Sequence, residues 1–117
     1  DYLCPMVYPQ TFGPGNAGYR DPWNWPYEIV YNSTLRAKER VPVHTRVRPW
    51  IQAYGCCGRG GHSLAEKMIQ RLAAENADSA GWTYWHAGGH YPPELFGPLP
   101  SLEELQAQVD AVTGRRR

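Results

Sequence analysis

The sequence predicts an α/β protein built from three consecutive strand–helix units whose strands run parallel. Three observations carry this prediction: short apolar runs that suit buried strands, apolar stripes at helical spacing behind clear start signals, and regular alternation of the two along 117 residues. This length allows one domain or part of one. The chain is 42% apolar and 20% charged, which is typical of a folded rather than a disordered protein.

The first unit opens the sequence. Residues 2–8 are apolar throughout and predict a strand that is covered on both faces. Residues 9–25 hold many Gly, Pro and aromatic residues, so we expect a long loop, and long loops in compact domains are commonly functional. A helix is predicted from Pro26, which suits the first helical position, to about Arg40.

The second unit follows the same order. Residues 44–53 predict a strand despite one internal proline, and a glycine-rich loop follows at residues 55–61. Ser63 and Glu66 have the spacing of a capping box, which predicts the start of an amphipathic helix that ends near Asp78.

The third unit completes the chain. Residues 81–85 predict a short strand. Ser101 and Glu104 again have capping-box spacing, and Gly114 is suited to end the helix that they begin.

Two architectures fit three such units: a small three-layer sandwich, or a segment of a (β/α)₈ barrel. Three parallel strands alone leave two open edges and too little helical cover. Because the sequence opens inside an apolar strand, we expect residues 1–114 to hold strands six, seven and eight of a TIM barrel. Residues 115–117 are expected to be a short basic tail.

Charge and hydropathy exclude several functions. The net charge is +1, and the basic residues cluster only at Arg115, Arg116 and Arg117, so we expect no nucleic-acid partner. No apolar stretch approaches the roughly 18 residues of a membrane span. Aromatic residues make up 13% of the chain and are mostly Trp and Tyr, which favours an aromatic cleft.

The cysteines predict neither a disulfide scaffold nor a metal site. Cys56 and Cys57 are adjacent, a spacing that does not readily give an ordinary bridge. They and His62 make the nearest metal-like group, which lacks a second ligand pair, so we expect no metal and no cofactor. We expect small thiols in a glycine-rich loop.

Four motifs in order resemble a known family: DYLCPMVYP at residues 1–9, PYEIV at 26–30, RPWIQ at 48–52, and GWTYW at 81–85 ahead of Tyr91. They are similar to the C-terminal part of a bacterial glycosyl hydrolase domain with a TIM-barrel fold. The resemblance covers about residues 1–91 and implies carbohydrate hydrolysis. It also implies a location in the bacterial cell envelope or outside the cell.

This chain departs from the family pattern at two strand ends. Gln10 and Thr11 stand where the family usually has Ser-His, and Ala53 stands where it often has an acidic residue. Both differences remove polar or titratable groups from the expected mouth of the barrel.

Glycoside hydrolysis usually needs two carboxylates beside the scissile bond, and the predicted strand ends offer none. Asp21 and Glu94 are the acids in loops at that end, and a loop acid beside Arg20 suits an ion pair. The remaining acids after Asp1 fall on predicted helices, where we expect solvated charges: Glu28, Glu39, Glu66, Glu75, Asp78, Glu103, Glu104 and Asp110. The catalytic residues are therefore unknown and expected in the earlier strands.

The residues at the strand ends suit substrate recognition instead. Tyr and Trp rings can stack on a sugar, and amide groups can both donate to and accept from its hydroxyls. Arg48 is either a member of a buried ion pair or a lumen residue that orients a carboxylate of a neighbouring strand. We expect Trp50 and Trp82 to fill either the core of the barrel or the layer between helices and strands. The predicted substrate-binding residues are Tyr8, Gln10, Arg48, Gln52, Tyr54, Trp85 and His86.

We thus expect part of a glycoside hydrolase that acts on an oligo- or polysaccharide. Two alternatives stay open. One is a non-catalytic carbohydrate-binding protein that kept the cleft without the acids. The other is an independent α/β interaction module, which could pair its open strand edges with a second copy.

Overall fold

The computed structural model describes residues 1–114, so the expected basic tail lies outside the described residues. Three α-helices match their predicted positions: α1 (Pro26–Arg40), α2 (Leu64–Asn76) and α3 (Leu102–Thr113). Single turns of 3-10 helix lie in the loops: η1 (Pro9–Thr11), η2 (Asn16–Gly18), η3 (Pro22–Asn24) and η4 (Pro93–Phe96). The order of strands and helices confirms the α/β prediction.

The strands are short and all their pairings are parallel. They are β1 (Tyr2–Leu3), β2 (Met6–Val7), β3 (Arg46–Val47), β4 (Trp50–Gln52) and β5 (Thr83–Trp85). One sheet has the order β1-β3 and the other β2-β4-β5. Neighbours in the three-stranded sheet are therefore successive along the chain.

Each of the first two predicted strands appears as two short ones because of a matched pair of prolines. The register pairs Leu3 with Val47 and Met6 with Trp50, which places Pro5 beside Pro49. Neither proline has an N–H to donate, so the ladder is interrupted there. The Trp50 N–H still donates to the Pro5 carbonyl at 2.8 Å, so the chains stay side by side.

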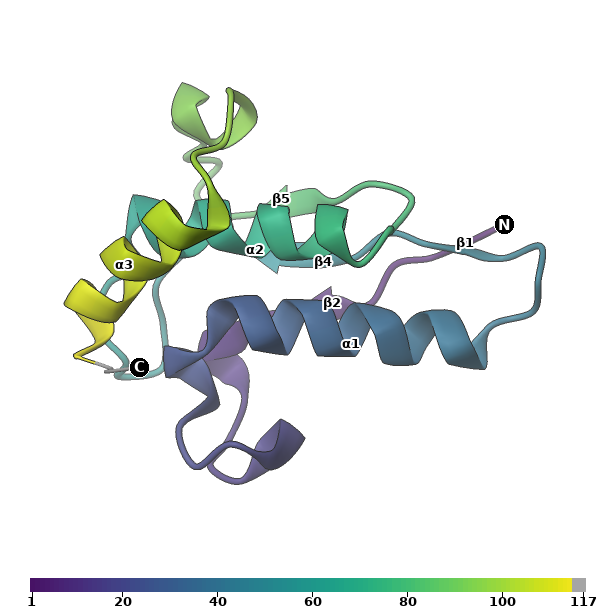
Figure 1. The fold of residues 1–117 in the computed structure, drawn as a ribbon, viewed down its shortest axis with the longest axis horizontal. Helices are drawn as coiled ribbons and strands as arrows, with labels where there is room; N and C mark the ends of the chain where they lie inside the picture. The colour runs from purple at the N-terminus through teal and green to yellow at the C-terminus, as the bar shows by residue number, and fades with distance from the viewer. Residues whose placement is uncertain (115–117) are drawn as a thin grey trace.

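The helices cover one face of the three-stranded sheet. Figure 1 shows α1 and α2 side by side in front of the strands, with α3 crossing near the start of α2. The three-layer sandwich is therefore wrong for the described residues. The prediction that residues 2–8 are covered on both faces is also wrong, since Met6 is 72% exposed.

The core lies between this sheet and the helices. Alternate residues of the strands point to the same face, and Val7, Ile51 and Tyr84 share one register and are buried. They pack with Ile29 of α1 and Ala73 of α2. A second cluster joins α2 to α3.

Both predicted helix caps form. Ser63 and Glu66 make the full capping box, in which each side chain accepts from the backbone N–H of the other residue. Ser101 accepts from the Glu104 N–H, and Gly114 ends α3 with a φ of 71°, which glycine adopts without cost. Among the described residues, no helix is both long and apolar enough to cross a membrane.

Candidate functional site

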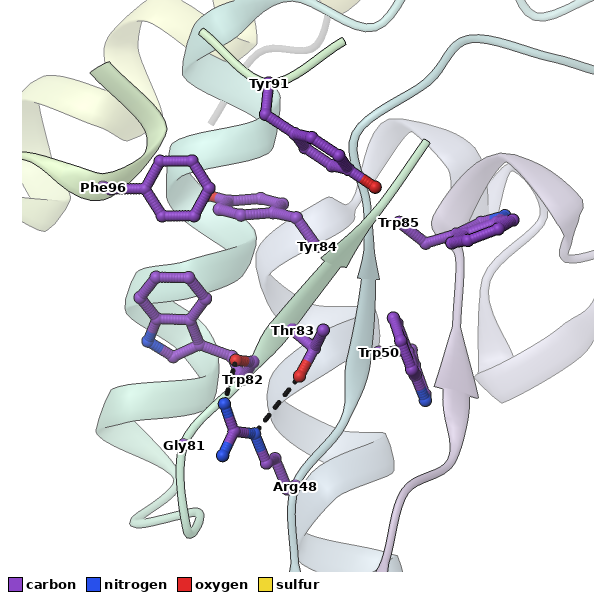
Figure 2. Close-up of a pocket in the computed structure, with 9 residues that line it drawn as sticks. All are labelled: Arg48, Trp50, Gly81, Trp82, Thr83, Tyr84, Trp85, Tyr91 and Phe96. Atoms are coloured by element: carbon purple, nitrogen blue, oxygen red, sulfur yellow. Dashed lines mark hydrogen bonds between the residues drawn. The ribbon is translucent and has the colours of Figure 1, made fainter. Parts of the chain in front are cut away.

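The face of the sheet that the helices leave open carries aromatic residues. Trp50 of β4 and Trp85 of β5 point to this face, and their rings are perpendicular with centroids 6.1 Å apart. In Figure 2 the Trp50 ring is seen nearly edge-on, with the Trp85 ring above it. Trp85 remains 43% exposed, so part of a large apolar ring at the C-terminal end of a strand is open to a ligand.

Two hollows share these indole rings as walls. The smaller, of about 400 Å³, lies between Met6, Tyr8, Trp50 and Trp85. The larger, of about 650 Å³, runs along β5 and includes Tyr91 and Phe96 (Figure 2). No acidic side chain of the described residues lines either hollow.

Tyr8 and Tyr54 stand at the ends of β2 and β4, beside the smaller hollow. Their rings meet edge to face with centroids 5.6 Å apart. Burial raises the pKa of Tyr8, with further contributions from Tyr54 and Tyr91, and burial also raises the pKa of Tyr54. Both phenols are therefore neutral at physiological pH, so each hydroxyl can donate to and accept from a sugar hydroxyl.

Arg48 lies apart from this group, at the other end of β4. Its Nε donates to Thr83 Oγ1 at 3.2 Å and its Nη2 to the Trp82 carbonyl at 3.3 Å (Figure 2). Arg48 is exposed within residues 1–114, so these residues do not bury it in an ion pair. The structure pairs it with no carboxylate among residues 1–114.

Gln10 and Gln52 are buried against each other rather than exposed to a ligand. Gln52 Oε1 accepts from the Gln10 N–H at 3.0 Å, and Gln52 Nε2 donates to Gln10 Oε1 at 2.8 Å and to the Tyr54 carbonyl at 2.6 Å. Both N–H groups of the Gln52 amide and its carbonyl oxygen thus have partners inside the protein. In this structure both residues position the loops around Tyr8 and Tyr54.

A buried polar network behind Gln52 was not predicted from the sequence. Gln70 of α2 accepts from the Gln52 N–H and donates to the Gln52 carbonyl, both at 2.9 Å. Its Nε2 also contacts His62 Nε2 at 2.7 Å. The Gln52 N–H fixes which end of the Gln70 amide is oxygen, so the nitrogen end of that amide faces His62.

Glu66 completes this network, which corrects the prediction that it is a solvated helix charge. Its carboxylate is buried and lies 3.4 Å from His62 Nδ1. Burial alone would raise the pKa of Glu66, but the hydrogen bond and charge of His62 and the bonds from Ser63 outweigh it, so the pKa lies below its usual value. The polar side chains at α2 gave no periodic signal that could have revealed this arrangement.

His86 and Asp21 make contacts mainly with residues close to them in the sequence. His86 Nδ1 accepts from the Gly88 N–H at 2.9 Å, and the Tyr91 hydroxyl accepts from the His86 N–H at 2.9 Å. Asp21 accepts from the indole of Trp25 and from the amide of Asn24, and these bonds order the long loop.

Glu94 is exposed in η4 and lines neither hollow. Trp82 packs against the core between the sheet and the helices, which is one of its two expected places. Trp50 lies on the open face of the sheet.

The glycine-rich loop after β4 holds a disulfide, so the prediction of free thiols there is wrong. Cys56 and Cys57 are bonded to each other although they are adjacent. Cys4 is free and exposed. Within residues 1–114 there is no cluster of three or more His, Cys, Asp or Glu residues that could hold a metal ion.

The chain was compared with curated proteins, solved structures and models of protein families. No curated protein and no solved structure matches the chain at a significant level. A family model described as "Putative glycosyl hydrolase domain" matches residues 1–91, which include all five strands, α1 and α2. This range covers well over half of the 117 residues. The chain therefore belongs to this family of glycosyl hydrolase domains.

Proposed function

We propose that the chain binds a polysaccharide at the C-terminal ends of β2, β4 and β5, as part of a domain that hydrolyses glycosidic bonds. Membership in the family supports the carbohydrate-active role. The observation that carries the choice of site is Trp85, a large ring that is 43% exposed at a strand end and is supported edge-on by Trp50.

The chemistry of this rim suits a sugar ring. A pyranose presents an apolar C–H face, which stacks on a flat aromatic ring, and a border of hydroxyls, which need neutral donors and acceptors. Trp85 supplies the first requirement. The neutral hydroxyls of Tyr8 and Tyr54 supply the second, and their pKa values are raised by burial.

The arrangement of strands and helices supports the proposal that these strands are part of a larger barrel. In a TIM barrel successive strands are neighbours, all helices lie outside, and the site is built at the C-terminal strand ends. The β2-β4-β5 order and the single helix-covered face agree with this plan. We infer that further strands cover the open face and supply the two carboxylates, with Met6 and Trp50 inside the barrel and Tyr8 and Trp85 at its mouth.

A second candidate is a carbohydrate-binding domain without hydrolytic activity. It is favoured by one observation: neither hollow at the aromatic rim is lined by a carboxylate of residues 1–114. Both candidates predict sugar binding. Only the first predicts that the whole protein releases reducing ends from the polysaccharide it binds.

The resemblance to bacterial hydrolases implies the cell envelope or the exterior, and we propose such an oxidising location. Disulfides form and persist in oxidising compartments and are rare in reducing ones, and the chain holds the Cys56–Cys57 bond.

The test is calorimetric titration of the chain with β-1,4-linked hexasaccharides of glucose and of N-acetylglucosamine. Trp85→Ala is expected to weaken binding by more than tenfold, because it removes the stacking surface. Tyr2→Ala is the matched control: it removes a ring that is also exposed, at 57%, at the opposite end of the strands and should leave the affinity unchanged. Equal affinity of Trp85→Ala and the parent chain would overturn the proposed site.

A further inference from the structure

The loop at residues 55–61 is closed at its base by one buried side chain. Gln10 Oε1 accepts from the Cys56 N–H at 2.9 Å, and Gln10 Nε2 donates to the Gly61 carbonyl at 3.2 Å. Gly55 lets the two ends approach closely, because a Cβ there would lie 3.0 Å from the Gly60 carbonyl oxygen. The loop is therefore a small closed unit whose two ends are joined through Gln10.

Backbone conformation in this loop depends on the disulfide. Cys57 has a φ of 66° and Gly58 follows with a φ of 71°. Glycine adopts this left-handed region freely, whereas a residue with a side chain rarely does. The bond between Cys56 and Cys57 closes a small ring around their shared peptide group, and we infer that this ring holds Cys57 in a conformation that it would otherwise leave.

The same bond is accessible. Cys57 is exposed and Cys56 is half-buried, and exposed disulfides are the ones most open to exchange with thiols. The loop tip adds one further contact, in which the Arg59 guanidinium lies 3.5 Å from the centroid of the Trp23 ring. These contacts are local to the loop and to the segment of Trp23. The capping box that starts α2 uses only groups of Ser63 and Glu66, so it shares no hydrogen bond with these contacts.

We propose that the Cys56–Cys57 bond is a redox-sensitive latch that holds the loop at residues 55–61 closed onto Gln10. A small dithiol would open it by thiol–disulfide exchange. The S–S bond breaks and each cysteine sulfur gains a proton, while the two thiols of the reductant form a disulfide and supply the two electrons and two protons. Cys57 then relaxes toward negative φ and the Cys56 N–H leaves Gln10.

Opening the latch affects the proposed binding rim, and this consequence rests on the proposed function. Tyr54 is two residues before Cys56, and its carbonyl accepts from Gln52, the direct partner of Gln10. Loss of the hydrogen bond from the Cys56 N–H removes one of the contacts of Gln10, and with it one of the bonds that order the chain around Tyr54. We expect the reduced protein to bind the hexasaccharides more weakly than the oxidised one.

The deciding measurement is amide hydrogen exchange of the oxidised chain and of the same chain reduced with dithiothreitol. The amides of Cys56 and Arg59, which donate inside this region, should exchange at least tenfold faster after reduction, while amides in the middle of α1 and α2 keep their protection. Unchanged exchange at the loop would overturn the latch. Faster exchange throughout both helices would also overturn it, because the bond would then support the whole fold.

Two variants and a binding arm complete the design. The double substitution Cys56→Ser and Cys57→Ser should reproduce the reduced loop without reductant, and Cys4→Ser, which removes the free thiol, should respond like the parent chain. If the double variant does not fold, reduction of the parent chain still decides the question. Sugar binding absent from both redox forms would count against the proposed function but not against a latch that the exchange data support.

Discussion

The two faces of the β2-β4-β5 sheet are built from alternating residues of the same strands, yet they differ completely in how they are covered. Val7, Ile51 and Tyr84 face α1 and α2 and are buried, whereas Met6 and Trp85 face the other way and are exposed. The helix-side face is complete within this chain. The open face is not covered by the described residues, and that difference separates residues that stabilise the fold from residues available for binding.

The largest expected effect is a difference in the free energy of unfolding between substitutions on the two faces of the sheet. Ile51→Ala removes a fully buried side chain and should lower the free energy of unfolding by about 2–5 kcal/mol. Trp85→Ala removes a half-exposed ring and should lower it by about 1 kcal/mol or less. Urea unfolding monitored by circular dichroism measures both. Equal losses would mean that the open face is part of the core.

The buried polar network of Gln52, Gln70, His62 and Glu66 allows a second test of how much the helix side contributes to stability. Gln70→Met removes the side-chain partner that the N–H and carbonyl of Gln52 have inside the protein, which should cost about 3 kcal/mol. Gln108→Met, at an exposed position of α3, is the control and should change stability little. A loss for Gln70→Met no larger than that of the control would show that water replaces the amide.

Helix capping should give a smaller effect. Ser63→Ala removes half of the capping box on α2 and should cost about 1 kcal/mol. Ser101→Ala removes the corresponding hydroxyl from α3, for which the structure shows only the Ser101 half of the pair. We expect the smaller loss there, and urea midpoints of the two variants compare them directly. A larger loss of stability for Ser101→Ala than for Ser63→Ala would contradict the expectation that a complete capping box stabilises its helix more than half of one.

The smallest expected effect is a dependence of the free energy of unfolding on pH. The pKa of Glu66 is lower in the folded protein than its ordinary value of 4.5, so the folded state favours the carboxylate. Its contribution to stability is complete above about pH 4.5 and is lost as pH falls through the lower folded pKa. The stability difference between the parent chain and Glu66→Gln should therefore shrink between pH 6 and pH 3. Glu103→Gln, at an exposed site, should show no such trend.

Much of the fold follows from local signals in the sequence. Pro26, the capping pair Ser63 and Glu66, and Gly114 mark helix ends, and the structure places the helices there. The interruptions at Pro5 and Pro49 depend on the register between two strands 44 residues apart. A single strand carries no information about that register, so the match of the two prolines could not be predicted.

The site was predicted less completely, for a physical reason. Tyr8, Tyr54 and Trp85 do gather at the strand ends, since parallel strands bring their C-terminal ends to one edge. Gln10 and Gln52 lie at the same ends but bond to each other, and amide side chains that can donate and accept suit either a ligand or a neighbour. The Cys56–Cys57 bond escaped prediction because adjacent cysteines rarely pair.

The central claim is that the open aromatic face binds sugar through Trp85. The most direct test is ¹⁵N NMR of the five tryptophan indole N–H groups during titration with the two hexasaccharides. We predict that the signals of Trp85 and Trp50 shift with a common saturation curve, while those of Trp23 and Trp25, which lie in the long loop, stay in place. Saturable shifts at the loop tryptophans alone, or no shift at any indole, would contradict the claim.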